Sequence, residues 1–349
     1  MFETFGFQTV TAPDLAPWLG LVLGLMFGLL AEATGFCFRR AVIGPAETRR
    51  PALGIWMATL AAAVLGTQAV VAAELVSFDG HRLLSSELPL LALLVGGLMF
   101  GAGMVLTRGC VSRLTVLTGS GNLRAALVLI VFAVVAQATL KGALAPLRTT
   151  LAEPTLPVGV ASLGALPGGP LLWATLVSGA ALAMAVRSGA PRRHLVLALL
   201  LGLLVPAAWL GTGVVLRDDF DPIPFEALAF TAPAADTVFW AMAATALKPG
   251  FGVGLIGGVL LGAMAGARAS GRFRWQSFKS PAQTGRYLTG AALMGVGGVL
   301  AGGCTVGAGL SGVPTLGLAA FIALGAIAAG ARATEALLTS PVRAGLAAP

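Results

Sequence analysis

The sequence predicts an all-α fold: a polytopic membrane protein of about nine transmembrane helices, with additional short or re-entrant helices. Two observations predict this class. Of the 349 residues, 57% are hydrophobic and only 10% are charged, whereas a soluble domain carries about 25% charged residues. The chain also holds many apolar runs of about 20 residues, the length that crosses a bilayer. This composition argues against a soluble enzyme, a nucleic-acid-binding protein and a disordered chain.

Hydropathy divides the chain into nine long apolar segments. A tenth segment, 237–247, is too short to cross a bilayer and ends at Lys248-Pro249-Gly250, which predicts a re-entrant piece or an interfacial helix. We expect residues 1–349 to form a single transmembrane transport domain. The nine predicted spans are 17–36, 54–76, 89–106, 123–140, 171–187, 194–213, 250–267, 287–302 and 315–331.

The formal charge of +8 is distributed unevenly among the connections between spans. Basic residues concentrate in the loops 39–50, 187–193 and 268–286, whereas the connection 214–236 is acidic. Because cytoplasmic loops of membrane proteins carry an excess of Lys and Arg, the basic loops are predicted to be cytoplasmic, with the N-terminus outside and the C-terminus inside. Some of these charges can instead attract anions to the mouths of a pore.

Histidine and cysteine, the residues that commonly build metal and thiol sites, are scarce. His81 and His194 lie in polar connections, and no cysteines have the paired spacing of a zinc or redox site. We therefore expect no metal, no cofactor and no catalytic residues. Cys37, Cys110 and Cys304 are far apart in the sequence, and an isolated cysteine in a membrane helix is most often a small buried apolar residue.

An internal repeat gives the three cysteines a shared context. The pentapeptide Gly-Leu-Met-Phe-Gly occurs at 24–28 and again at 97–101. In each place a cysteine, Cys37 or Cys110, follows the last glycine by nine residues, and Cys304 follows a glycine by the same interval. This common spacing favours a functional role for the cysteines over simple packing.

A fourth copy of the pattern lies at 254–271, with Gly271 in the position of the cysteine. The copies therefore form two pairs, which predicts a transporter built from two related halves. The first half covers about 17–145 and the second about 237–332, with intervening helices at about 146–236. Transporters with inverted repeats place their site between the repeats, on short or glycine-interrupted helices.

The segments after the cysteines are irregular and rich in glycine. Free backbone N–H groups in such turns and at helix starts bind anions. Asn122 is suited to cap the helix that follows one of these turns, while Arg108 and Arg113 either attract anions or extend to the membrane surface. The candidate substrate-binding residues are Cys37, Cys110, Cys304, Gly109, Gly303 and Thr305, together with Arg108, Arg113 and Asn122.

One acidic residue, Glu32, falls inside the first predicted span. A charge in the hydrocarbon region is costly, so it is normally paired or functional. We expect Glu32 to form an ion pair with Arg39 or Arg40, which follow in the same segment.

The motifs around the cysteines resemble the YeeE/YedE family of thiosulfate-uptake membrane proteins. The resemblance covers about 18–332 and rests on Gly-Phe-Cys at 35–37, Gly-Ala-Gly-Met-Val-Leu-Thr-Arg-Gly-Cys at 101–110, Gly-Asn-Leu at 121–123 and Leu-Ala-Gly-Gly-Cys-Thr-Val-Gly-Ala-Gly-Leu-Ser-Gly at 300–312. It implies a multi-pass protein of the bacterial inner membrane that takes up thiosulfate. It also implies that the three cysteines take part in substrate passage.

The chain departs from the family pattern in two places. Many members have a glycine two or three residues after the middle cysteine, where this chain has Ser112 and Arg113, and 141–236 matches no family motif. Related members handle other sulfur or selenium species, which stay open as alternative substrates. The family is often encoded with or fused to a small cytoplasmic sulfur-carrier protein (TusA-like), and the resemblance implies such a protein as a separate partner.

The chemistry of thiols suggests how such an anion could cross. Thiosulfate is a dianion with a terminal sulfur, and conduction requires contacts weak enough to be exchanged. A neutral thiol is a weak donor and a polarizable group. Three thiols in series therefore predict a relay through transient S–H···S hydrogen bonds, with basic residues only at the mouths. A membrane thiol enzyme of the sulfurtransferase type and a structural subunit of a larger complex are the alternatives to a transporter.

Overall fold

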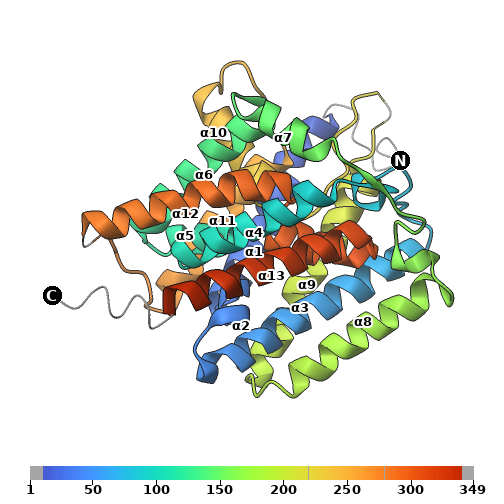
Figure 1. The fold of residues 1–349 in the computed structure, drawn as a ribbon, viewed down its shortest axis with the longest axis horizontal. Helices are drawn as coiled ribbons and strands as arrows, with labels where there is room; N and C mark the ends of the chain where they lie inside the picture. Colours follow the sequence, from blue (N-terminus) through green and yellow to red (C-terminus); the bar gives the residue numbers. More distant parts are fainter. Residues whose placement is uncertain (1–10, 219, 279, 340–349) are drawn as a thin grey trace.

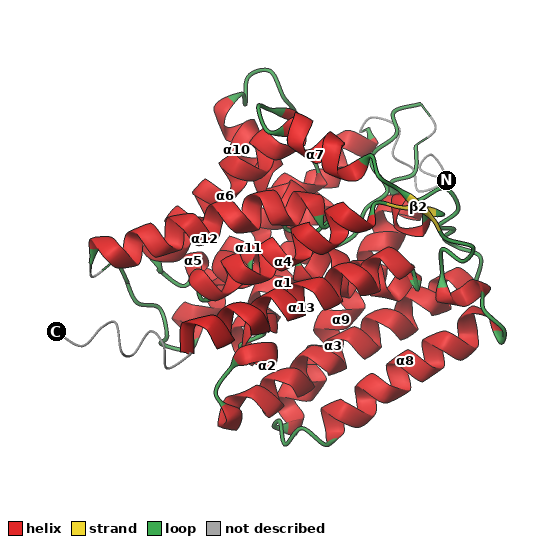
Figure 2. Ribbon diagram, viewed as in Figure 1, coloured by secondary structure: helices red, strands yellow, loops and turns green. Residues whose placement is uncertain are grey.

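The computed structural model describes residues 11–218, 220–278 and 280–339, and this part of the chain is almost entirely helical (Figures 1 and 2). It contains nine helical spans long and apolar enough to cross a bilayer, which confirms the predicted fold class. The spans are Ala12–Ile43, Ala46–Ala72, Leu90–Gly119, Leu123–Lys141, Gly169–Val186, Arg192–Val215, Phe251–Ala269, Pro281–Thr315 and Leu318–Thr339.

Several spans consist of more than one helix, and short elements connect them. Two-residue strands, β1 and β2, pair antiparallel with Leu88 opposite Leu156. The elements are α1 (Ala12–Thr34), α2 (Phe38–Ile43), α3 (Ala46–Ala72), η2 (Arg82–Leu84), β1 (Glu87–Leu88), α4 (Leu90–Leu106), α5 (Val111–Gly119), α6 (Leu123–Lys141), α7 (Ala145–Ala152), β2 (Leu156–Pro157), η3 (Leu163–Ala165), α8 (Gly169–Val186), α9 (Arg192–Leu210), η4 (Gly211–Val215), α10 (Thr231–Met242), α11 (Phe251–Ala269), α12 (Pro281–Leu300), η5 (Thr305–Gly312), η6 (Val313–Thr315) and α13 (Leu318–Thr339).

Three spans are interrupted by a residue in the left-handed conformation. This residue is Gly35 between α1 and α2, Arg108 between α4 and α5, and Gly302 between α12 and η5, with φ angles of 63°, 63° and 71°. A left-handed residue ends the regular i to i−4 hydrogen bonding of a helix. In each span it lies two positions before a cysteine, so the sequence repeat corresponds to a repeated break in the backbone.

Stripes of glycine let α1 and α11 pack with their backbones in close approach. A Cβ atom on Gly20 would meet the backbone of Phe251, and one on Gly28 would meet the backbone of Val259. The two helices are therefore parallel, and a larger side chain would separate them. The glycines that share this arrangement are Gly20, Gly24, Gly28, Gly254, Gly258 and Gly262.

The second pair of repeat helices, α4 and α12, packs in the opposite sense. A Cβ atom on Gly96 would meet the backbone of Ala301, whereas one on Gly103 would meet Gly290. These helices are therefore antiparallel, as an inverted repeat requires, while α1 and α11 are parallel. A two-fold axis in the membrane plane makes every pair of corresponding helices antiparallel. Only α4 and α12 meet this condition, so the division into two equivalent halves stays a prediction.

The acidic connection that follows η4 runs into the core of the bundle. It reaches Phe230, which is fully buried and lies 5.2 Å from the ring of Phe27 in α1. Beside it, Ser311 of η5 donates a hydrogen bond of 2.6 Å to the carbonyl of Leu228. The chain then turns back as α10. The predicted short apolar segment 237–247 overlaps this returning helix, so the re-entrant alternative describes it better than the interfacial one.

The three basic loops lie at one end of the bundle. The turns from α2 to α3, from α8 to α9 and from α11 to α12 gather at the left and lower left of Figure 1. The start of α1 lies at the other end, where Asp14 forms an exposed ion pair with Lys248 at 3.1 Å. This grouping agrees with the predicted cytoplasmic face, and we call that end the inner end.

Candidate functional site

Each cysteine is the N-cap residue of the helix that follows a break. Cys37 precedes α2, Cys110 precedes α5 and Cys304 precedes η5. All three are free and buried, with exposed fractions of 8%, 1% and 0%. The first N–H groups of a helix have no partner within it. The repeated local structure therefore places each thiol at the start of a helix, and the thiol of Cys304 accepts a hydrogen bond from a backbone N–H of that helix.

The three cysteines, remote in sequence, are neighbours in series in the folded chain. Cys110 lies close enough to interact electrostatically with both Cys37 and Cys304, so it occupies the middle position. The tertiary packing of α1, α4 and α12 thus brings together the three thiols that the sequence singles out. We call this set the thiol line.

The thiols differ in their hydrogen-bond partners. The Sγ atom of Cys304 accepts a hydrogen bond of 3.4 Å from the backbone N–H of Gly307. The Sγ atom of Cys110 lies 3.2 Å from the hydroxyl of Ser112, and either group can donate. The serine that departs from the family pattern is therefore the direct partner of the middle thiol.

The other predicted backbone residues flank the thiol line. Gly109 directly precedes Cys110, and Gly303 directly precedes Cys304. Thr305 is the first residue of η5 and is buried. Their positions suit the predicted role, but their contact with a substrate stays a prediction.

Asn122 caps a helix, and Arg108 is the left-handed residue at the break between α4 and α5. Asn122 caps α6, as predicted, because its side chain accepts hydrogen bonds from the N–H groups of Arg124 and Ala125 at 3.1 and 3.2 Å. It also donates to Gln276 of the α11–α12 connection at 3.2 Å. Arg108 is exposed at the break after α4. A substrate contact of either residue stays a prediction.

A cavity of about 390 Å³ lies at the outer side of Cys304. It is lined by the glycine backbone around that cysteine and by residues of η2 and of the connection before α10, including His81, Arg82, Glu226, Thr231, Gly302, Gly303 and Gly307. Arg82 donates a hydrogen bond of 3.1 Å to the carbonyl of Gly302. The cavity therefore places a cation at the break that precedes Cys304.

Burial in this outer cavity changes the protonation of its ionisable groups. Burial, reinforced by the nearby Asp236 and opposed by Arg82, raises the pKa of Glu226 to about 7. Burial and the adjacent Arg82 lower the pKa of His81. Sequence reasoning missed Arg82 and Glu226. The available signal was the position of Glu226 directly before a short apolar stretch, 227–230, within an acidic connection.

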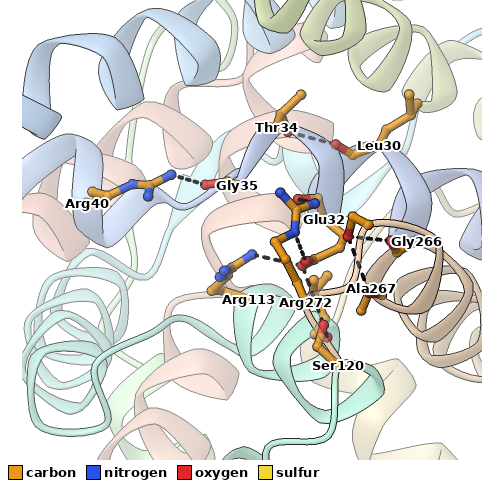
Figure 3. A network of polar contacts seen from close by, with 12 residues as sticks. Leu30, Glu32, Thr34, Gly35, Arg40, Arg113, Ser120, Gly266, Ala267 and Arg272 are labelled. Carbon is orange, nitrogen blue, oxygen red and sulfur yellow. Dashed lines mark hydrogen bonds and ion pairs between the residues drawn. The ribbon is translucent and has the colours of Figure 1, made fainter. Parts of the chain in front are cut away.

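At the inner end, Glu32 is buried in a network of polar contacts (Figure 3). Its Oε1 atom lies 3.1 Å from Nε of Arg272, and its Oε2 atom lies 3.8 Å from Nη1 of Arg113. Ser120 donates a hydrogen bond of 3.4 Å to the same Oε2 atom. Arg272 also donates to the backbone carbonyl of Glu32 at 3.2 Å.

The predicted partners of Glu32, Arg39 and Arg40, are wrong. Arg40 donates instead to the carbonyl of Gly35, which the end of α1 leaves without a helical partner. Glu32 faces α5 and the α11–α12 connection, so its cations come from elements distant in sequence. Arg113, predicted to guide anions or extend to the surface, is only 21% exposed and turned to this carboxylate.

In the residues that the structure describes, nine apolar spans, three of them broken next to the buried thiols, define a multi-pass membrane protein of the transporter class. The chain belongs to the sulphur transport family, which matches residues 33–333. It is similar to the thiosulfate transporter TsuA of Spirochaeta thermophila, with 26% identity over 327 residues, covering 88% of this chain and 94% of the relative. It is also similar to the thiosulfate transporter TsuA of Escherichia coli, with 27% identity over 318 residues, covering 83% and 86%. The resemblance predicted from the cysteine motifs is confirmed.

Proposed function

We propose that this protein takes up thiosulfate, or a closely related small sulfur anion, across the bacterial inner membrane. The names of the two relatives support this substrate class. The observation that carries the proposal is the thiol line, in which three buried cysteines at helix N-cap positions, from three broken spans, lie near one another in series.

The anion reaches the thiol line through the outer cavity, where Arg82 lies at the break before Cys304. It then passes Cys304, Cys110 and Cys37 in turn, held at each by an S–H donor and by the amides of the following helix. These contacts are weak, because a thiol is a poor donor. Weak, repeated contacts replace hydration without trapping the anion.

The terminal sulfur of thiosulfate suits this passage better than an oxygen does. Sulfur is larger and less strongly hydrated, so its transfer to a mostly apolar site costs less. Burying an oxyanion oxygen without a strong hydrogen-bond donor costs several kcal/mol of transfer free energy. The thiol line therefore selects for an anion that carries a soft terminal atom.

Inside the cell, the anion is passed to sulfur metabolism, and we propose a small sulfur-carrier protein of the TusA type as a separate cytoplasmic partner. The basic loops at the inner end provide a positively charged surface for such a contact. Because the protein transports its substrate rather than changing it, thiosulfate arrives intact.

The test is uptake of labelled thiosulfate by purified protein in liposomes, with the triple variant Cys37→Ala/Cys110→Ala/Cys304→Ala as the control. Uptake by the wild type alone, with the internal label recovered as thiosulfate, is expected. Absence of uptake by the purified wild type would refute the transporter. Recovery of sulfite or another cleavage product would favour a thiol enzyme.

A further inference from the structure

The Glu32 network contains more positive charge than its single carboxylate neutralises: Arg113 and Arg40 are partly buried, and Arg272 is half exposed. Nη1 of Arg113 is buried and has no hydrogen-bond partner among the described residues, because the carboxylate oxygen at 3.8 Å is beyond hydrogen-bond distance. Nε of Arg40 is also buried and has no hydrogen-bond partner among the described residues. Buried cationic donors without acceptors are costly, so this arrangement is suited to accept a further anionic group.

The network is also contiguous with the thiol line. Arg113 lies one turn after Cys110 on α5 and interacts electrostatically with Cys37. Glu32 lies on α1 five residues before Cys37. The guanidinium of Arg113 therefore lies near both the innermost thiol and the Glu32 carboxylate, beside the inner end of the thiol line.

The two cations that face Glu32 are bound with different strength. Arg272 contacts the carboxylate at 3.1 Å and also donates to the backbone carbonyl of Glu32 at 3.2 Å. Arg113 contacts it only at 3.8 Å, without a hydrogen bond. Figure 3 shows the carboxylate between the two guanidinium groups, with Arg272 above it and Arg113 to one side. Arg113 is thus the cation that another anion can take over.

We propose that Arg113 and Arg272 form an inner anion-binding site for the transported anion, and that Glu32 is the resident counter-ion of this site. The inference rests on the proposed function, because it specifies how the same anion leaves. The planar guanidinium of Arg113 can bind two oxygens of an oxyanion at once, which its contact with Glu32 does not achieve. The arriving dianion replaces Glu32 at Arg113 while Glu32 keeps Arg272.

The carboxylate then promotes release. With the anion bound, two negative groups share one site, and their repulsion weakens the hold of both arginines on the anion. When the anion departs, Glu32 pairs again with Arg113. Without Glu32, the site would retain the anion, because arginines alone bind it strongly in a partly dehydrated place.

The variant Glu32→Gln tests this directly, since glutamine keeps the size and one acceptor oxygen but removes the charge. Thiosulfate binding is measured by titration calorimetry on the detergent-purified protein, and maximal uptake is measured in liposomes. We expect the Kd to fall about tenfold, equivalent to about 1.4 kcal/mol, while maximal uptake falls because release is slower.

The matched control is Asp14→Asn, which removes the carboxylate of the exposed Asp14–Lys248 ion pair at the other end of the molecule. We expect its Kd and maximal uptake to equal those of the wild type. The opposite variant, Arg113→Gln, should weaken binding about tenfold, and the double variant Glu32→Gln/Arg113→Gln should lose the tight binding of Glu32→Gln.

The possible failures are distinguishable. A wild type that transports no thiosulfate refutes the proposed function itself. A wild type that transports, with Glu32→Gln matching Asp14→Asn in both Kd and maximal uptake, overturns the inner site alone. If Glu32→Gln does not give a monodisperse protein, Arg113→Gln decides, and unchanged binding in that variant overturns the inner site.

Discussion

The two ends of the thiol line are built differently. Beyond Cys304 lies a cavity of about 390 Å³ with one arginine, Arg82, and a carboxyl group, Glu226, whose pKa of about 7 leaves it partly neutral. Beyond Cys37, the space is occupied by the Glu32 network with two ion-paired arginines. The same cysteine-capped break therefore adjoins an open cavity at one end and a network of ion pairs at the other.

The difference also extends to the backbone that presents each thiol. η5 after Cys304 is a wide, glycine-rich helical turn, whose Gly307 amide reaches the sulfur. α5 after Cys110 is a regular helix whose Ser112 hydroxyl reaches the sulfur instead. The thiols are equivalent in the sequence pattern, but the donors beside them change from backbone N–H to side-chain hydroxyl along the line.

Substitution of single cysteines should have the largest effect, and it tests whether the thiols at the two ends of the line are both required for uptake. In Cys304→Ala or Cys37→Ala, one step of the line loses its donor in a dehydrated place, which costs about 1–3 kcal/mol. We expect initial thiosulfate uptake in liposomes to fall about tenfold to a hundredfold for each variant, and for Cys110→Ala likewise. Because alanine fills nearly the same space, each variant should remain monodisperse. A variant with normal uptake would identify its cysteine as a packing residue.

Competition by sulfate tests whether the line between the ends selects for the terminal sulfur. We expect a hundredfold excess of sulfate to reduce initial uptake of labelled thiosulfate by less than half, because weak thiol donors do not replace the hydration of sulfate oxygens. Cys110→Ser should not create a sulfate carrier, since two thiol steps remain. Equal competition by the two anions would mean that the protein selects its substrate by charge and size alone. The thiol relay would then have to be abandoned.

External pH should affect the outer end and leave the inner end unchanged. Glu226 has a raised pKa of about 7, so it is mostly neutral at pH 6 and mostly ionised at pH 8. The ionised carboxylate repels an arriving dianion, so uptake should fall about fivefold from pH 6 to pH 8 for a repulsion of about 1 kcal/mol. The ionisable groups that face Glu226 or line the adjoining cavity are His81, Arg82, Lys141, Asp236 and Lys248.

The variant Glu226→Gln separates this carboxyl from the other groups. With internal pH held constant, its uptake should remain near the wild-type value at pH 6 and lose most of the decline toward pH 8. Burial and the adjacent Arg82 lower the pKa of His81, so it loses its charge at a lower pH than an ordinary histidine does. An unchanged pH profile in Glu226→Gln would assign the titration to another group.

The comparison of the ends also indicates what the sequence could predict. Hydropathy located the nine spans, because membrane helices are encoded by contiguous apolar residues. The nine-residue spacing indicated that the helices are interrupted near Cys37, Cys110 and Cys304, and the turn chemistry of Asn122 located a helix cap. The expected irregular backbone after each cysteine is wrong, because the break comes two residues before the cysteine and a helix begins directly after it. These features depend on neighbours in the chain.

The partners of Glu32 and the outer cavity depend instead on how distant elements meet. Arg113 and Arg272 reach Glu32 only because the glycine stripes bring α11 against α1 and because α5 packs beside them. The inward path of the connection to Phe230 is fixed by contacts with Phe27 and with Ser311. Helix rotation and loop path are not encoded in local hydropathy, so the sequence predicted a nearby arginine for Glu32 and missed Glu226.

The smallest expected effect concerns the middle of the thiol line, at Ser112. Many members of the family have a glycine near this position. The Ser112 hydroxyl and the Cys110 thiol contact each other at 3.2 Å. Whichever group donates, an anion must replace this hydrogen bond to reach the thiol. Ser112→Ala removes the competitor and keeps α5 regular, because alanine is a strong helix former. A buried hydrogen bond contributes about 0.5–1.5 kcal/mol, so we expect initial uptake to rise about threefold, with Thr118→Ala, a hydroxyl that donates within α5 to Leu114, as the unchanged control. A loss of uptake in Ser112→Ala would instead show that the hydroxyl itself holds the passing anion, and the middle step would then be a serine–cysteine pair rather than a thiol alone.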